Sequence, residues 1–242
     1  MICITSFHKE HWNIYADKFI QTWIKHWPQD SKLYSYHQEF PIAHPRIENI
    51  DLDNVSEFKK FKNTTESIIK TITNDKEKNR YLKGLRWAHK VYAICDLINN
   101  TNEPIIWLDA DTYSKKNIPL NYDRLLLDDK DLAVHVETQN NMIHWETGLF
   151  VISGSVADRR ILRDNIMSLY NSGDIWKKKK TWDGHMWPEC CNHMQLNDLN
   201  KNIQGLRKGY FGNKNVRPYM VHLAGDSKFT SAVNKRSGRS NS

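Results

Sequence analysis

The stretch Ile105–Asp111, with the sequence IIWLDAD, decides the fold of this chain. A continuous apolar run that stops abruptly at acidic residues is typical of a central strand that is buried on both faces and ends at a polar edge. Residues 80–98 precede this run with apolar side chains at helical spacing, and the turn-prone residues 99–102 separate the two. A helix that leads into a buried strand predicts an α/β fold.

The rest of the sequence continues this alternation of strands and helices. The predicted helices include one that Pro28 ends and one at residues 157–170, and the further predicted strands lie at residues 2–7, 32–37, 47–52, 132–136, 148–153 and 218–222. We expect a single α/β domain over residues 1–229, with a mixed, mostly parallel central sheet flanked by helices. Residues 230–242 form a basic tail that we expect to be disordered.

Two expectations concern the helical region before the deciding strand. Residues 56–79 carry many charges and few large apolar side chains, which predicts an exposed helix or a mobile excursion rather than core. In the helix that follows, the spacing predicts one core-facing set of side chains: Leu82, Leu85, Ala88, Val91, Ile94, Cys95 and Ile98.

Composition excludes several classes of protein. The 242 residues are 39% hydrophobic and 26% charged, which is a globular mixture and excludes wholesale disorder. No run approaches the roughly 20 apolar residues that cross a bilayer, and the first residues lack the basic and apolar regions of a signal peptide, so we expect a cytosolic protein. The four cysteines include no C-x-x-C pair, and we expect all four to be reduced.

The charge balance is basic. Thirty-five Lys and Arg residues against 28 Asp and Glu residues give a formal net charge of +7, which favours association with a polyanion. A chain so rich in Lys, Asn and Ile also reaches such a balance through compositional bias alone, so charge by itself does not identify a partner.

Asp109 and Asp111 follow the buried strand directly. Ligands of open α/β sheets bind beyond the carboxyl ends of the strands, and two carboxylates one residue apart can converge on one hard cation. The same spacing recurs at 51/53 and 129/131, but only the pair at 109/111 ends a core strand. The sequence therefore offers a candidate cation site there, against the alternative of an ordinary polar exit from a strand.

A second cluster of chemically active residues follows the last predicted strand. The segment HLAGDSK places His222, Gly225 and Lys228 within seven residues. An imidazole can add a third ligand to a cation held by carboxylates and shifts the preference from magnesium towards manganese. A lysine nearby can neutralise a phosphate group.

Together, the segments IIWLDADTYS, ETGLF and HLAGDSK resemble the nucleotide-sugar glycosyltransferases of the GT-A (Rossmann-like) fold. The resemblance is closest to family 8, which includes glycogenin-like and bacterial galactosyltransferase-like enzymes and carries D-x-D and a downstream H-x-x-G-x-x-K. It covers roughly residues 1–229. It implies that Asp109, Asp111 and His222 hold Mn²⁺, or else Mg²⁺, on the diphosphate of a donor such as a UDP-sugar. It further implies that Lys228, in the motif with Gly225, contacts that diphosphate.

The resemblance assigns further residues to the donor. The family has a basic residue on the helix before D-x-D, and Lys90 matches this place more closely than Arg86, one turn earlier on the same face. Glu146 and Thr147 stand where the family usually has Asn-Ser, and the carboxylate of Glu146 can bind donor hydroxyls. Asp183 lies in a segment resembling the one that places an acid near the transferred sugar. In the retaining mechanism of family 8, Asp183 orients the sugar, whereas an inverting enzyme would use it as the base.

The acceptor is a hydroxyl group, and the sequence does not directly identify the molecule that bears it. The run Lys177–Lys180, the basic tail and the net charge motivate one hypothesis, a hydroxymethylated base in double-stranded DNA, as in phage-type DNA glycosyltransferases of the host cytoplasm. A lipopolysaccharide or polysaccharide acceptor stays open. Trp182, His185 and Trp187 offer stacking surfaces, although aromatic residues at this spacing more often belong to a core.

Two other classes of function also fit some of these residues. A metal-dependent phosphodiesterase or nuclease uses carboxylates and histidine, but would be expected to carry more carboxylates than Asp109 and Asp111. A non-catalytic DNA-binding module fits the charge, but leaves the pairing of the two motifs unexplained.

Overall fold

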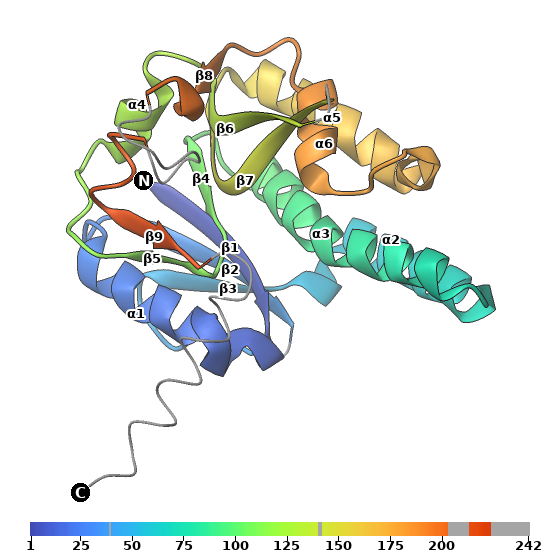
Figure 1. Cartoon of the computed structure of the whole chain (residues 1–242). Helices are drawn as coiled ribbons and strands as arrows, with labels where there is room; N and C mark the ends of the chain where they lie inside the picture. The colour runs from blue at the N-terminus through green and yellow to red at the C-terminus, as the bar shows by residue number, and fades with distance from the viewer. Residues whose placement is uncertain (39, 140–141, 203–212, 224–242) are drawn as a thin grey trace, which may run out of the picture.

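A seven-stranded mixed sheet forms the centre of the molecule (Figure 1), in the order β3-β2-β1-β4-β7-β6-β8. The computed structural model describes residues 1–38, 40–139, 142–202 and 213–223. The strands are β1 (Ile2–His8), β2 (Lys32–Gln38), β3 (Ile47–Asp51), β4 (Ile105–Leu108), β6 (Leu132–Gln139), β7 (Met142–Ile152) and β8 (Leu196–Asp198). Only β7 runs antiparallel to its neighbours, so the predicted mixed, mostly parallel sheet is confirmed.

Helices cover both faces of this sheet. They are α1 (Asp17–His26), α2 (Ser56–Thr71), α3 (Asp75–Asn100), α4 (Tyr122–Leu127), α5 (Val156–Asn171) and α6 (Asp183–Cys190). One core cluster lies between the sheet and α2, α3, α5 and α6, and the other lies between the sheet and α1 and α4. In β4, Ile105 and Trp107 belong to the first cluster and Ile106 and Leu108 to the second, which explains the continuous apolar run.

A small second sheet lies at the end of β4. It pairs β5 (Thr112–Ser114) with β9 (Met220–His222) in antiparallel orientation. The strand predicted near residues 218–222 therefore exists, but it pairs with β5 rather than joining the main sheet. Neither β5 nor β8 was predicted, because each is only three residues long and has no clear alternation.

The expectation that residues 56–79 lie outside the core is wrong. Phe58, Phe61 and Ile69 of α2 are buried, and the first two pack against Tyr92 of α3. The predicted core face of α3 is also corrected at one place, since Leu82 is 46% exposed. Figure 1 shows why: the start of α3 extends with α2 beyond the sheet, so the sheet does not cover it.

The four cysteines are buried and free, as expected. In the described parts of the chain, no helix combines the length and the apolar character needed to cross a membrane. The predicted tail at 230–242 lies outside the described residues.

Candidate active site

Two carboxylates and an imidazole meet where β4 ends. Asp109 and Asp111 follow β4 directly, and the pairing of β5 with β9 sets His222 opposite Thr112. The His222 Nε2 atom lies 2.9 Å from Asp111 Oδ1. One oxygen of each aspartate and one nitrogen of His222 all lie within 4.8 Å of one another, so the residues predicted as metal ligands converge.

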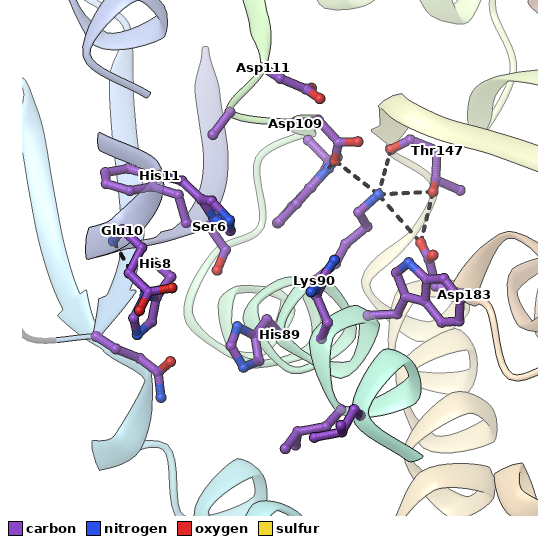
Figure 2. A pocket seen from close by; sticks show the side chains of 18 of the residues that line it. Ser6, His8, Glu10, His11, His89, Lys90, Asp109, Asp111, Thr147 and Asp183 are labelled. Carbon is purple, nitrogen blue, oxygen red and sulfur yellow. Dashed lines mark hydrogen bonds and ion pairs between the residues drawn. The ribbon is translucent and has the colours of Figure 1, made fainter. Parts of the chain in front are cut away.

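A lysine from α3 links this group to the next acids. Lys90 Nζ lies 2.9 Å from Asp109 Oδ1 and 3.4 Å from Asp183 Oδ2. It also donates to the Thr147 hydroxyl at 2.9 Å and to the Thr147 carbonyl at 3.1 Å. Figure 2 shows the amine of Lys90 between Asp109, Thr147 and Asp183, with dashed lines to all three. The Trp107 indole completes the network by donating to Asp109 Oδ1 at 2.7 Å.

The position of Lys90 follows from the helical pattern. It lies on α3 beside the core positions Ala88 and Val91, and its side chain is only 11% exposed. Burial lowers the pKa of Lys90, but the negative charges of Asp109 and Asp183 outweigh it and hold the pKa above its ordinary value. The amine is therefore charged throughout the neutral pH range.

Asp183 is the first residue of α6 and is fully buried. Its Oδ2 atom accepts a hydrogen bond from the Thr147 hydroxyl at 2.7 Å. Within the described residues, its buried Oδ1 atom has no hydrogen-bond partner. A buried carboxylate oxygen without a donor is costly, so this atom is suited to accept a hydrogen bond from a bound ligand hydroxyl.

The close packing of α6 on β7 fixes Asp183. A Cβ atom at the next residue, Gly184, would lie 2.2 Å from the carbonyl oxygen of Trp145. Only a residue without a side chain allows this approach. The glycine therefore determines how deeply the start of α6 enters the site.

Two more ionisable groups face the same charges. Burial raises the pKa of Glu146 to about 7, and the charge of Asp109 adds to this effect, while His222 and Lys90 oppose it. Burial lowers the pKa of His222, but its hydrogen bond to Asp111 and the charge of that residue outweigh burial and raise it. Several acids and bases are thus held close together in a partly desolvated site, which is a common property of functional sites.

A pocket of about 840 Å³ opens over the acidic residues of this site. Its wall includes Asp109, Asp111, Glu146 and Asp183, and further side chains from β1, α2 and α3. The volume falls in the range of pockets that bind cofactors and other small molecules. Lys90 and Arg86 both line it, as predicted from their shared helical face.

The structure separates the three Asp-x-Asp pairs. Asp53 forms an ion pair with Lys62 at 2.8 Å, and Asp131 accepts a hydrogen bond from the Gln195 amide at 2.8 Å. Neither of these pairs joins a group of ligating side chains among the described residues. Gly225 and Lys228, which the sequence motif assigns to the diphosphate, lie outside the described residues.

Sequence reasoning did not assign a role to Thr147 or Trp107. Thr147 contacts Lys90 from a position 57 residues away, and the indole of Trp107 holds Asp109. Strand alternation offered one signal, because it places Trp107 and Asp109 on the same side of the strand. No local pattern indicates the contact of Thr147.

No protein-family model matches the sequence, and no curated protein matches it either. Solved structures, in contrast, share its fold. LgtC, as an active-site mutant, aligns with a TM-score of 0.55 at 11% identity, over 97% of this chain and 96% of that chain. The galactosyltransferase LgtC in complex with donor and acceptor sugar analogs gives a TM-score of 0.53. Mouse xyloside xylosyltransferase 1 gives 0.51 at 11% identity, over 84% of this chain and 87% of that chain.

At such identities the likeness establishes the architecture alone. The mixed, mostly parallel sheet with helical layers on both faces matches the architecture of these structures over nearly the whole chain. The chain therefore has the α/β fold of the GT-A glycosyltransferases.

Proposed function

We propose that this protein is a metal-dependent glycosyltransferase that moves a sugar from a nucleoside-diphosphate sugar, a UDP-sugar in the first instance, to a hydroxyl group. The observation that carries this proposal is the convergence of Asp109 and Asp111, which line a pocket of ligand size, with His222 beside them, within a GT-A fold. This is the edge of the sheet where α/β proteins bind their ligands.

The ligating atoms of Asp109, Asp111 and His222 fit a divalent cation. Two carboxylates suit Mn²⁺ and Mg²⁺ alike, and the imidazole of His222 favours the transition metal, so Mn²⁺ is the proposed ion. Asp109, Asp111 and His222 would hold it. When bound, the cation would supply positive charge that stabilises the departing diphosphate.

The transfer breaks the bond between the anomeric carbon and the diphosphate oxygen, and the nucleoside diphosphate leaves with the electron pair. The acceptor oxygen forms the new bond to the anomeric carbon, and its proton passes to the departing diphosphate, whose oxygen carries the negative charge that the broken bond leaves. In this proposal, Arg86 adds positive charge to the pocket wall, and Lys228, near Gly225, contacts the diphosphate as the sequence motif implies. Lys90 keeps Asp109 and Asp183 in place through its ion pairs.

Asp183 and Glu146 are proposed to act on the sugar. The buried Oδ1 atom of Asp183 would accept a hydrogen bond from a sugar hydroxyl. Because Asp183 is fully buried and already bonded to Thr147 and Lys90, it fits an orienting role better than that of a base for the acceptor. This supports retention of the anomeric configuration. Glu146 lines the same pocket and would bind a second donor hydroxyl.

For the acceptor, we propose the hydroxyl of a hydroxymethylated base in DNA. The net charge of +7 supports a polyanionic partner. A glycosylation assay on hydroxymethylated DNA tests this choice. Absence of product with every donor that the enzyme hydrolyses would reject DNA in favour of a lipopolysaccharide or polysaccharide acceptor.

The donor side is tested by binding and turnover. Thermal unfolding with a panel of nucleotides and nucleotide sugars, with and without Mn²⁺, identifies the donor, because a ligand of the native state raises the melting temperature. We expect a metal-dependent shift with one UDP-sugar and slow hydrolysis of that sugar.

The metal assignment needs a matched pair of variants. Asp111→Asn removes a proposed ligand and should lower donor turnover by about 10³-fold, in line with the loss of a few kcal/mol of charge stabilisation. Asp129→Asn makes the same change at an exposed aspartate in another Asp-x-Asp pair and should leave turnover unchanged. Full activity of Asp111→Asn would contradict the proposal. Cleavage of plasmid DNA by protein and Mn²⁺ alone would instead support a nuclease.

A further inference from the structure

A second cavity, of about 380 Å³, lies beside α6. Three consecutive lysines, Lys178 to Lys180, line it together with His185. Lys178 is engaged in an ion pair with Glu189 at 2.5 Å. Lys179 and Lys180 are exposed and, within the described residues, form no ion pair or side-chain hydrogen bond. Glu189 also lines the cavity but is paired with Lys178, so two of the three positive charges there have no ion-pair partner among the described residues.

A cluster of aromatic rings connects this cavity to the large pocket. Trp182 lines the large pocket and His185 lines the small one, and their ring centroids lie 5.4 Å apart. His144 packs against both, at 5.2 Å from Trp182 and 5.4 Å from His185. The two cavities therefore share a wall, and a ligand bound in the small one lies next to the proposed active site.

The rings of this wall keep part of their surface accessible. Trp182 and His185 are half-buried, and Trp87, 6.4 Å from Trp182, continues the wall inside the large pocket. Burial lowers the pKa of His185, and the neighbouring His144 adds to this effect, so the ring is uncharged at neutral pH. Flat uncharged rings beside lysines are the combination that binds single-stranded nucleic acid, with phosphates on the cations and bases on the rings.

We propose that the small cavity binds the phosphodiester backbone of an unpaired nucleic-acid strand that carries the acceptor hydroxyl. Lys179 and Lys180 contact successive phosphates, and Trp182 and His185 stack an unpaired base at the entrance of the large pocket. This inference rests on the proposed glycosyltransferase function. It accounts for the free lysines, which a neutral glycan would leave without partners, and it meets the need of base-modifying enzymes to take a base out of its stack.

Binding of a fluorescently labelled oligothymidylate of about 12 nucleotides tests the site directly. Fluorescence anisotropy is measured at several salt concentrations for the full chain and for the double variant Lys179→Ala, Lys180→Ala. The matched control is Lys59→Ala, Lys60→Ala, which removes the same charge from an exposed pair on α2 that lines neither cavity.

We expect the variant at 179 and 180 to bind on the order of tenfold more weakly at 0.1 M salt. The slope of log affinity against log salt should fall by about 1.4, because each phosphate contact contributes about 0.7 in single strands. The control pair should change neither value. An oligothymidylate with an uncharged methylphosphonate backbone should compete poorly with the labelled strand.

Three results of the oligonucleotide experiments would overturn the inference. They are equal losses in the two lysine pairs, unchanged binding by the variant at 179 and 180, and equal competition by the uncharged backbone. A phosphorylated oligosaccharide that binds at these lysines while the oligonucleotide does not would also overturn it and would identify a phosphorylated glycan instead.

Donor hydrolysis by water separates this inference from the proposed function. It is measured in Mn²⁺ without any acceptor. Failure of the wild-type protein to bind or hydrolyse any nucleotide sugar would refute the glycosyltransferase function, whatever the oligonucleotide does. Normal donor hydrolysis with oligonucleotide binding that is indifferent to Lys179 and Lys180 would refute the strand site alone.

Discussion

The large pocket and the small cavity beside α6 hold their positive charges in opposite ways. In the large pocket, Lys90 is buried and shared between Asp109, Asp183 and Thr147. At the small cavity, Lys179 and Lys180 are exposed and free of acidic partners among the described residues. A buried network fixes the geometry of the groups that form it, whereas exposed charges stay available to a partner. The contrast predicts that the Lys90 network controls folding and turnover, whereas the lysines of the small cavity control only the binding of a partner.

The largest effect on stability is expected at Lys90. The substitution Lys90→Met leaves the buried carboxylate of Asp183 without its cation and should lower the free energy of unfolding by about 3 kcal/mol. Arg86→Met, on an exposed residue one turn earlier on the same helix, should change it by less than about 0.5 kcal/mol. Urea unfolding of both variants without metal checks the comparison. Equal stabilities would mean that the Lys90 network does not hold the site.

A substitution at Gly184 tests whether the position of Asp183 is needed for donor hydrolysis. Gly184→Ala adds a methyl group that meets the Trp145 carbonyl, so α6 must shift and carry Asp183 with it. We expect a loss of about 2 kcal/mol in stability, as for other overpacked sites. Donor hydrolysis, measured well below the melting temperature, should fall by up to about 100-fold, because a displacement near 1 Å has such consequences. Unchanged hydrolysis in the folded variant would separate Asp183 from catalysis.

The sequence predicted the parts of this site that local patterns determine. The run IIWL predicted a strand buried on both faces, and the acids after it predicted a candidate cation site at its end, where they lie close to His222 in the structure. Helical spacing predicted that Lys90 points away from the apolar face of α3, and in the structure Lys90 lines the pocket and pairs with Asp109, while its contact with a donor stays a prediction. Each of these inferences needed only a few neighbouring residues.

What the sequence did not reveal depends on contacts between distant residues. The sequence motif predicted His222 as a ligand together with Asp109 and Asp111, but it did not reveal that His222 meets Asp111 through the pairing of β9 with the three-residue strand β5, which is too short to leave a periodic pattern. Burial of α2 was missed because Phe58 and Phe61 lie among lysines, and only the packing of α2 on α3 shows which face is covered. The shared wall of the two cavities likewise depends on the packing of α6 beside β7.

A smaller effect, which depends on pH, is expected at His89, on the pocket wall of α3 (Figure 2). Burial, with a contribution from the charge of Lys62, lowers its pKa to about 4. The unfolded chain therefore binds a proton at higher pH than the folded one, and the stability that the neutral ring provides is lost as the pH falls below about 6.5. Relative to His89→Gln, the wild type should lose about 1 kcal/mol between pH 7 and about pH 5.5.

Urea unfolding at the two pH values measures this difference. The variant His89→Gln is the control for the wild type, because glutamine does not titrate. Parallel pH dependence in both proteins would show that the ring at position 89 is solvated. In that case the wall between α2 and α3 would resemble the exposed surface at Lys179 and Lys180 more than the buried surroundings of Lys90.

The smallest effect is expected where the charges are free. The double variant Lys179→Ala, Lys180→Ala breaks no ion pair or side-chain hydrogen bond among the described residues, so its free energy of unfolding should match the wild type within about 0.5 kcal/mol. Its rate of donor hydrolysis should also be unchanged, since neither lysine lines the large pocket. Urea unfolding and hydrolysis assays measure both quantities. A loss of stability comparable to that of Lys90→Met would mean that these lysines belong to the folded network, and the contrast between the fixed charge of the large pocket and the available charges of the small cavity would fail.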